Sequence, residues 1–202
     1  MARLAIFIDG GYICSLAEKE FSIWVDYYIL PNKFLEIVQS RTREPVDLLR
    51  TYYYDCLPYQ SDPPTKEEAD RFAKARSFHD FMSRLSRFTI RQGRLKFRGL
   101  DSSGQPIFQQ KRVDIMLGLD IALLSAKHQI THMAIVAGDS DLLPAFEVAR
   151  TEGVSVWLFH GPRFSRIDNT STYADELWRG ADERFEIDLA FMKSIERKRT
   201  QE

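Results

Sequence analysis

The chain has 202 residues, with 28 Lys and Arg against 29 Asp and Glu, a formal net charge of -1 and 44% hydrophobic residues. This balance suits one compact domain and excludes both general disorder and a protein that coats polyanions by bulk charge. The longest apolar run, residues 4–8, is far shorter than the roughly 20 residues of a membrane helix. The two cysteines have neither the spacing of a metal-binding knuckle nor that of a redox motif, so a disulfide framework or structural zinc site is not expected. We therefore expect a cytoplasmic protein with no membrane partner.

Strand and helix patterns alternate along the chain. Strands are expected at residues 4–8, 46–54, 88–91, 133–137 and 154–159. Helical spacing of apolar residues marks residues 67–86, 113–127 and 142–151, and a later helix is expected around 172–178. Because the first, fourth and fifth strands have no polar face, we expect an α/β fold, a mainly parallel sheet between two helix layers.

One segment interrupts this alternation. At about residues 94–111, apolar and basic residues alternate on either side of a turn-rich stretch, which predicts an antiparallel hairpin inserted into the fold. No internal repeat or linker divides the chain. We therefore expect a single domain over residues 1–190, followed by a C-terminal helix end and tail at 191–202.

Acidic residues follow two of the expected strands at one edge of the sheet. Asp9 comes directly after the first strand, and Asp139 and Asp141 follow the fourth. In an open parallel sheet, ligands bind beyond the carboxyl ends of the strands where the chain order reverses. If the two strands are neighbours, these carboxylates face one crevice, and Asp114 at the start of the preceding helix can lean over it. Asp120, about 240° further around that helix, is expected to point elsewhere.

A group of converging carboxylates has a chemical consequence. Like charges a few ångströms apart raise one another's pKa unless a cation compensates. A hard divalent ion such as Mg²⁺ prefers oxygen ligands and is typically held by a few carboxylates plus substrate phosphate, which matches an all-Asp set. Such an ion can activate water and neutralise charge on a phosphate under attack. The sequence therefore predicts phosphodiester hydrolysis.

Each of these acidic residues also has a structural interpretation. Asp9 could cap the first helix, and Asp114 could be an ordinary acidic residue of a first helical turn. Asp139 and Asp141 could cap the helix at residues 142–151. The combination favours a site, because independent caps have no reason to gather at one end of a sheet.

Several short runs, taken in chain order, are similar to those of a known family. They are Phe7 to Gly11, Gln92 to Leu95, Lys111 to Asp120, Val136 to Leu142, and Leu177 followed by Ala181, Asp182 and Phe185. On these runs the chain resembles the NYN domains of the LabA-like (DUF88) group, relatives of PIN-domain ribonucleases. The resemblance implies a three-layer PIN-like fold with sheet order 3-2-1-4-5, a Mg²⁺ or Mn²⁺ site and metal-dependent cleavage of RNA, most readily single-stranded. It implies metal-binding and catalytic roles for Asp9, Asp114, Asp139 and Asp141.

Two positions depart from the family pattern. Tyr12 stands where the family often carries Asn, and Arg112 replaces a Gly two residues before Asp114. Tyr12 could contact substrate through its hydroxyl or stack on a base. The alternative to a nuclease is a catalytically weak or inactive NYN domain that binds nucleic acid as a regulatory module.

Basic residues are most concentrated on the expected hairpin. Arg94, Lys96 and Arg98 share one strand face and could follow an RNA backbone while an aromatic ring stacks on a base. The same charges could instead protect an exposed edge strand from aggregation. In the expected sheet order the hairpin lies at the edge, some distance from Asp9.

Two further arginines follow the fifth strand. Arg163 and Arg166 could clamp a phosphate, because a guanidinium fork matches phosphate oxygens, although surface loops often carry Arg for solubility alone. An edge strand of the sheet also offers a route to a homodimer.

Overall fold

A parallel sheet forms the centre of the protein in the computed structural model, which describes residues 1–198. In that part of the chain, the main sheet has six strands in the order β3-β2-β1-β6-β7-β8, and each neighbouring pair is parallel. The strands are β1 (Ala2–Asp9), β2 (Val46–Asp55), β3 (Phe88–Gln92), β6 (His132–Val136), β7 (Ser155–His160) and β8 (Glu183–Glu186). The α/β prediction and the order of its five strands are confirmed. The sequence patterns missed β8, a short and charged edge strand.

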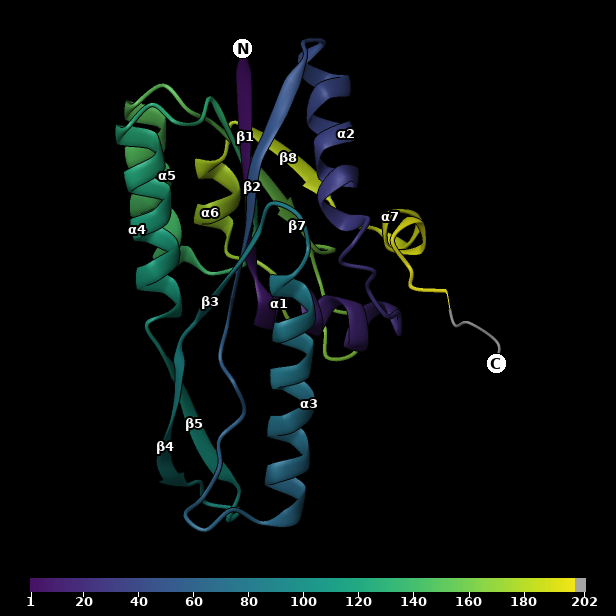
Figure 1. Ribbon diagram of the computed structural model, residues 1–202, viewed down its shortest axis with the longest axis vertical. Coiled ribbons are helices and arrows are strands. Elements are labelled where there is room, and N and C mark those ends of the chain that lie inside the picture. The colour runs from purple at the N-terminus through teal and green to yellow at the C-terminus, as the bar shows by residue number, and fades with distance from the viewer. Residues whose placement is uncertain (199–202) are drawn as a thin grey trace.

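Helices cover both faces of this sheet, with α4, α5 and α6 on one side and α2 and α7 on the other (Figure 1). The helices are α1 (Gly10–Ser15), η1 (Leu16–Phe21), α2 (Leu30–Thr42), α3 (Lys66–Ser83), α4 (Val113–Ala126), η2 (Ser140–Leu142), α5 (Leu143–Thr151), α6 (Asp175–Gly180) and α7 (Leu189–Ser194). Successive residues of a strand point to opposite faces. Leu4 and Ile6 of β1 accordingly join the core under α2, whereas Ala5 and Phe7 join the core under α4 and α5. This two-sided burial explains the unbroken apolar run of β1.

The predicted hairpin forms a separate antiparallel pair, β4 (Arg94–Leu100) and β5 (Pro106–Lys111). Figure 1 shows the hairpin and the first turns of α3 extending beyond the carboxyl ends of the central strands. A capping box between Thr65 and Glu68 starts α3. The apolar pattern of α3 predicted a longer buried face, but among its described residues only His79 and Met82 are buried. Its first turns lie past the sheet and therefore have little to pack against.

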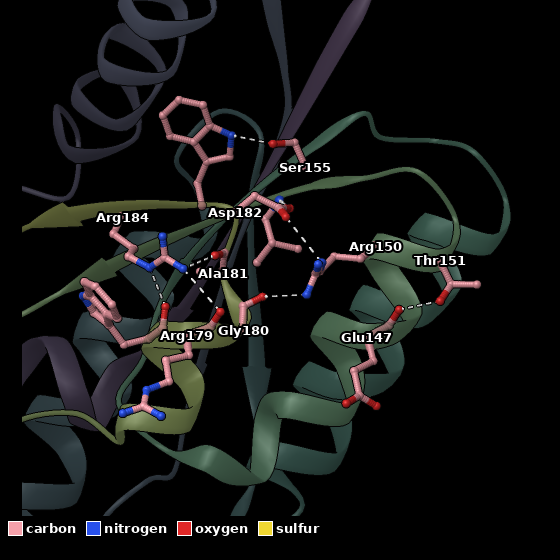
Figure 2. A network of polar contacts seen from close by, with 12 residues as sticks. Glu147, Arg150, Thr151, Ser155, Arg179, Gly180, Ala181, Asp182 and Arg184 are labelled. Carbon is pink, nitrogen blue, oxygen red and sulfur yellow. Dashed lines mark hydrogen bonds and ion pairs between the residues drawn. The ribbon is translucent and has the colours of Figure 1, made fainter.

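The edge strand β8 is held by a polar network around Asp182 (Figure 2). One Asp182 oxygen accepts a hydrogen bond from the Val156 amide at 2.8 Å, and the other lies 3.3 Å from Nε of Arg150. Arg184 donates to the carbonyl oxygens of Trp178 and Ala181. Ala181 and Asp182 therefore have a structural role, because their hydrogen bonds join α6 and β8 to the sheet.

Two further features differ from the sequence prediction. Helix α2 was not anticipated, although Leu30, Phe34 and Val38 are buried at helical spacing. The expected C-terminal helix end is short, because α7 ends at Ser194, and residues 199–202 of the expected tail lie outside the described residues. None of the helices in residues 1–198 combines the length and apolar character needed to cross a membrane.

Candidate active site

A cavity of about 490 Å³ opens at the carboxyl ends of β1 and β6. We call it the Asp9 cavity, and its lining includes Asp9, Tyr12, Gln110, Gly138, Asp139 and Thr172. β1 pairs with β6 on one side and with β2 on the other, so the chain order reverses at β1. The cavity therefore occupies the point where open parallel sheets bind ligands.

Asp9 is the last residue of β1 and has both of the roles considered from the sequence. It caps α1, because its Oδ1 accepts a hydrogen bond from the Tyr12 amide at 3.2 Å, and it also lines the cavity. Burial raises the pKa of Asp9 to about 6, and the negative charges of Asp114 and Asp55 add to the rise, whereas the Tyr12 and Gly11 amides oppose it. This carboxylate is therefore held in an unfavourable environment that a cation would relieve.

Asp139, one of the other predicted acidic residues, lines the same cavity, and Asp114 lies near enough for its charge to act on Asp9. Oδ1 of Asp139 accepts from the Asp141 amide at 3.0 Å and caps η2, and Asp139 lines the cavity together with Asp9. Asp114 lies in the first turn of α4. Burial raises the pKa of Asp114, and the charges of Asp139 and Asp141 raise it further. Asp139 thus caps a helix and also shares the cavity with Asp9, whereas the side chains of Asp114 and Asp141 are linked to this site through their charges.

A further carboxylate, not predicted from the sequence, lies beside this site. Asp55 ends β2, one residue beyond the Asp9–Tyr54 register pair, and its charge contributes to the raised pKa of Asp9. Its Oδ2 lies 3.1 Å from Nε2 of the buried His79, whose Nδ1 accepts a hydrogen bond from the side-chain Nε2 of Gln92 at 3.0 Å. The signal was the same as for Asp9, an acidic residue directly at the end of a buried strand.

Tyr12 connects the loops that surround the cavity. Its hydroxyl accepts a hydrogen bond from the Gly161 amide at 2.9 Å, and its ring lies against Gly138 closely enough that a Cβ there would be 2.6 Å from Cε2. Burial raises the pKa of Tyr12 to about 12. The Tyr12 ring and hydroxyl thus contact the segments that follow β6 and β7 and hold them against the segment after β1. This arrangement favours a role in positioning these loops over a role in stacking on a base.

A comparison with protein families identifies the chain's relatives. The family model for the NYN domain matches residues 3–186, a span that reaches every strand of the sheet and includes the walls of the Asp9 cavity. The chain belongs to the NYN domain family. NYN domains are PIN-like nucleases, so the coarse function is that of a nuclease family acting on nucleic acid. A search of curated proteins found none that matches the sequence.

The chemistry of this NYN site fits a divalent cation, and its spacing limits how such an ion is held. Within residues 1–198, no three His, Cys, Asp or Glu side chains stand close enough together to hold a metal ion. The four-Asp ligand set implied by the resemblance is therefore not gathered around one point. Mg²⁺, however, is commonly bound through one or two carboxylates, with waters and substrate phosphate completing its shell. Asp9 and Asp139, which share one cavity, fit that arrangement.

The two arginines predicted to clamp phosphate are engaged with protein groups. Arg163 forms an ion pair with Asp175, and its guanidinium lies 5.3 Å from the ring centre of Tyr173. The guanidinium of Arg166 lies 5.6 Å from the ring centre of Phe21. A phosphate would have to compete with these contacts, so a clamp at either arginine stays a prediction.

The position of the hairpin corrects one expectation about this NYN domain. The prediction that the hairpin lies some distance from Asp9 is wrong, because Gln110 of β5 lines the Asp9 cavity. β5 runs directly into α4, and the hairpin base is therefore anchored beside the site. Arg94 and Lys96 line a second cavity there, whereas Arg98 hydrogen-bonds to Gln109 at 2.8 Å.

Tyr12→Phe is expected to lower the free energy of unfolding by about 1–2 kcal/mol, because the Gly161 amide loses its acceptor in a largely buried place. Urea unfolding curves measure this change. Tyr28→Phe is the matched control, since Tyr28 is 72% exposed and its variant should stay within about 0.5 kcal/mol of the parent. Equal stabilities for the two variants would show that the Tyr12 hydroxyl does not join these loops.

Proposed function

We propose that this NYN domain is a metal-dependent ribonuclease of the LabA-like group that hydrolyses phosphodiester bonds in single-stranded RNA. The observation that supports it most is that Asp9, at the end of β1, and Asp139, in the loop after the neighbouring β6, line one cavity at the switch point of the sheet. Asp114 and Asp141 add negative charge beside it. A polyanionic substrate could not approach this group of carboxylates without a compensating cation.

The residues suggest a division of roles. Mg²⁺ or Mn²⁺, when bound, would offset the carboxylate repulsion and stabilise charge that develops on the phosphate. Asp9 at the end of β1 and Asp139 in the loop after β6 would hold it. Gln110 brings amide N–H donors to the same cavity, where they suit a phosphate oxygen.

Cleavage of an end-labelled, unstructured RNA tests this proposal. We expect products with Mg²⁺ or Mn²⁺ and none with EDTA, because the carboxylates alone repel the substrate. The control for contaminating nucleases is a pair of variants purified identically. Asp139→Asn should lose the activity, and Glu147→Gln, which changes an exposed acidic residue on α5, should keep it. Cleavage that persists in EDTA, or that is equal in Asp139→Asn, would rule the proposal out.

A second candidate is a nucleic-acid-binding regulatory module with little or no catalysis. It is favoured by the wide spacing of the acidic side chains and by Tyr12 at a position where the family often has Asn. RNA binding without cutting, both with Mn²⁺ and with EDTA, would support this module. A cytoplasmic location, a homodimer and a domain limit at residue 190 stay predictions from the sequence.

A further inference from the structure

A second cavity, of about 680 Å³, lies beside the hairpin and differs in charge from the Asp9 cavity. We call it the hairpin groove, and its lining includes Tyr59, Arg94, Lys96, Phe97, Lys111 and Arg112. These are four cations and two aromatic rings, and no acidic residue of the described chain is among the lining. In a protein whose net charge is -1, this is a local concentration of positive charge. It suits a polyanion.

The aromatic rings of this region form an open cluster. The Tyr59 ring centre lies 5.8 Å from that of Phe97 and 5.3 Å from that of Phe108, and the two Phe centres are 5.9 Å apart. Phe97 and Phe108 are each 40% exposed. The rings therefore fasten the hairpin to the loop before α3 and still present apolar surface to solvent. Such surface is what an unpaired base stacks on.

The hairpin groove and the Asp9 cavity adjoin at the end of β5, where Lys111 lines the groove and its chain neighbour Gln110 lines the cavity. Side chains two residues apart in a strand share a face, so Phe108 and Gln110 point the same way, about 7 Å apart along the strand. Gln110 lines the Asp9 cavity, and Phe108 belongs to the aromatic cluster. At the hairpin base, Lys111 pairs with Arg94.

Cross-strand partners share a face, so Arg94, Lys96 and Lys111 lie on the opposite face of the hairpin from the rings. The groove is lined by four consecutive residues of β4, Arg94 to Phe97, which present both faces along that strand. A strand of nucleic acid lying along β4 could therefore contact rings and cations together and reach the carboxylates at the hairpin base.

We propose that the hairpin groove binds one single strand of RNA and leads it into the Asp9 cavity. Bases stack on Tyr59 and Phe97, and the phosphates contact Arg94, Lys96, Lys111 and Arg112. A single strand is favoured over a duplex because only unpaired bases expose faces on which aromatic side chains can stack. This inference rests on the proposed nuclease function for the direction of the strand, whereas binding in the groove can be measured without cleavage.

Fluorescence anisotropy of a labelled, unstructured RNA in EDTA tests the groove, because EDTA removes the cation required for cutting. Tyr59→Ala should weaken binding about tenfold or more, and Tyr59→Phe should restore it, because the ring rather than the hydroxyl stacks. The double variant Arg94→Gln/Lys111→Gln should reduce the slope of log affinity against log salt by about 1.4, for two lost phosphate contacts. Lys127→Gln, on the exposed C-terminal end of α4, is the matched control and should change neither quantity.

The outcomes separate this proposal from the proposed nuclease function. Three results would each contradict the proposal that the hairpin groove binds single-stranded RNA. They are parental affinity in Tyr59→Ala, an unchanged salt slope in the double variant, and tighter binding of a duplex of the same sequence. If the protein binds RNA in the groove as expected but never cuts it, the proposed nuclease function is wrong and the proposed RNA binding in the groove is still supported. Circular dichroism of each variant shows whether it is folded, and the salt slope of the double variant, which keeps all three rings, does not depend on any structural effect of Tyr59→Ala.

Discussion

Asp9→Asn is expected to abolish RNA cleavage and, at the same time, to make the fold more stable at neutral and alkaline pH. The pKa of Asp9 rises from its ordinary value of 3.8 to about 6, chiefly because of burial. The native state therefore holds this proton more tightly than the unfolded state does. The stability that this gives is fully present below about pH 4 and is lost as the pH rises through about 6.

The size of this effect follows from the pKa shift. A rise of about two pKa units corresponds to roughly 3 kcal/mol, and we expect about 2 kcal/mol of added stability in Asp9→Asn at about pH 8. The Asn side chain removes the buried charge but keeps an oxygen that can accept from the Tyr12 amide, so the cap of α1 survives. A substitution that lowers activity but raises stability is typical of a residue that is retained for function.

Urea unfolding in EDTA, followed from about pH 4 to about pH 8, measures the stability part of this prediction. The curves of parent and variant should converge at acid pH and separate as the pH rises. Added Mn²⁺ should stabilise the parent more than the variant, because a ligand stabilises only the state that binds it. Retained cleavage, or equal stability at alkaline pH, would remove Asp9 from the proposed site.

Gly138→Ala is expected to lower both stability and activity, although the change adds one methyl group. A Cβ at this position would lie 2.6 Å from the carbonyl oxygen of Thr172 and 2.6 Å from Cε2 of Tyr12. Neither atom can give way easily, because one is backbone and the other belongs to a ring held by Gly161. The loop that carries Asp139 must therefore move. We expect a loss of about 1–3 kcal/mol in the free energy of unfolding and about 100-fold in cleavage rate.

Gly118→Ala is the matched control for Gly138→Ala. Gly118 lies within α4, and a Cβ there would have its nearest neighbour, Cβ of Ala145, at 3.9 Å, an ordinary contact. Because Ala favours a helix over Gly, this variant should gain up to about 1 kcal/mol and keep its activity. Thermal unfolding and the RNA cleavage assay would compare the two. Parental stability and rate in Gly138→Ala would mean that the Asp139 loop is not positioned by close packing.

The fold was predictable where local patterns and tertiary burial agree. Continuous apolar runs marked the buried central strands, and a turn between alternating residues marked the hairpin. Prediction failed where local patterns were weak or where burial differed. β8 has four residues with two charged ends, and α3 carries an apolar pattern that mostly lies beyond the sheet.

The candidate site likewise has residues that were predictable from the sequence and residues that were not. Asp9 and Asp139 could be found from the sequence, because an acidic residue at a strand end has its position fixed by the strand itself. Asp55 carried the same signal and was overlooked. The contact between Gln110 and the Asp9 cavity had no local signal, because it depends on how the hairpin folds back at its base.

By itself, the sequence determined which strands are buried on both faces, and therefore where the carboxyl ends of the sheet place Asp9 and Asp139. Only the tertiary structure decided how far apart the carboxylates stand, that Tyr12 is joined to Gly161, and that the basic hairpin adjoins the acidic cavity. The physical reason is that sequence patterns are local, whereas the site depends on long-range contacts. Periodicity reports which side of an element is buried, whereas these distances depend on contacts between segments that are far apart along the chain.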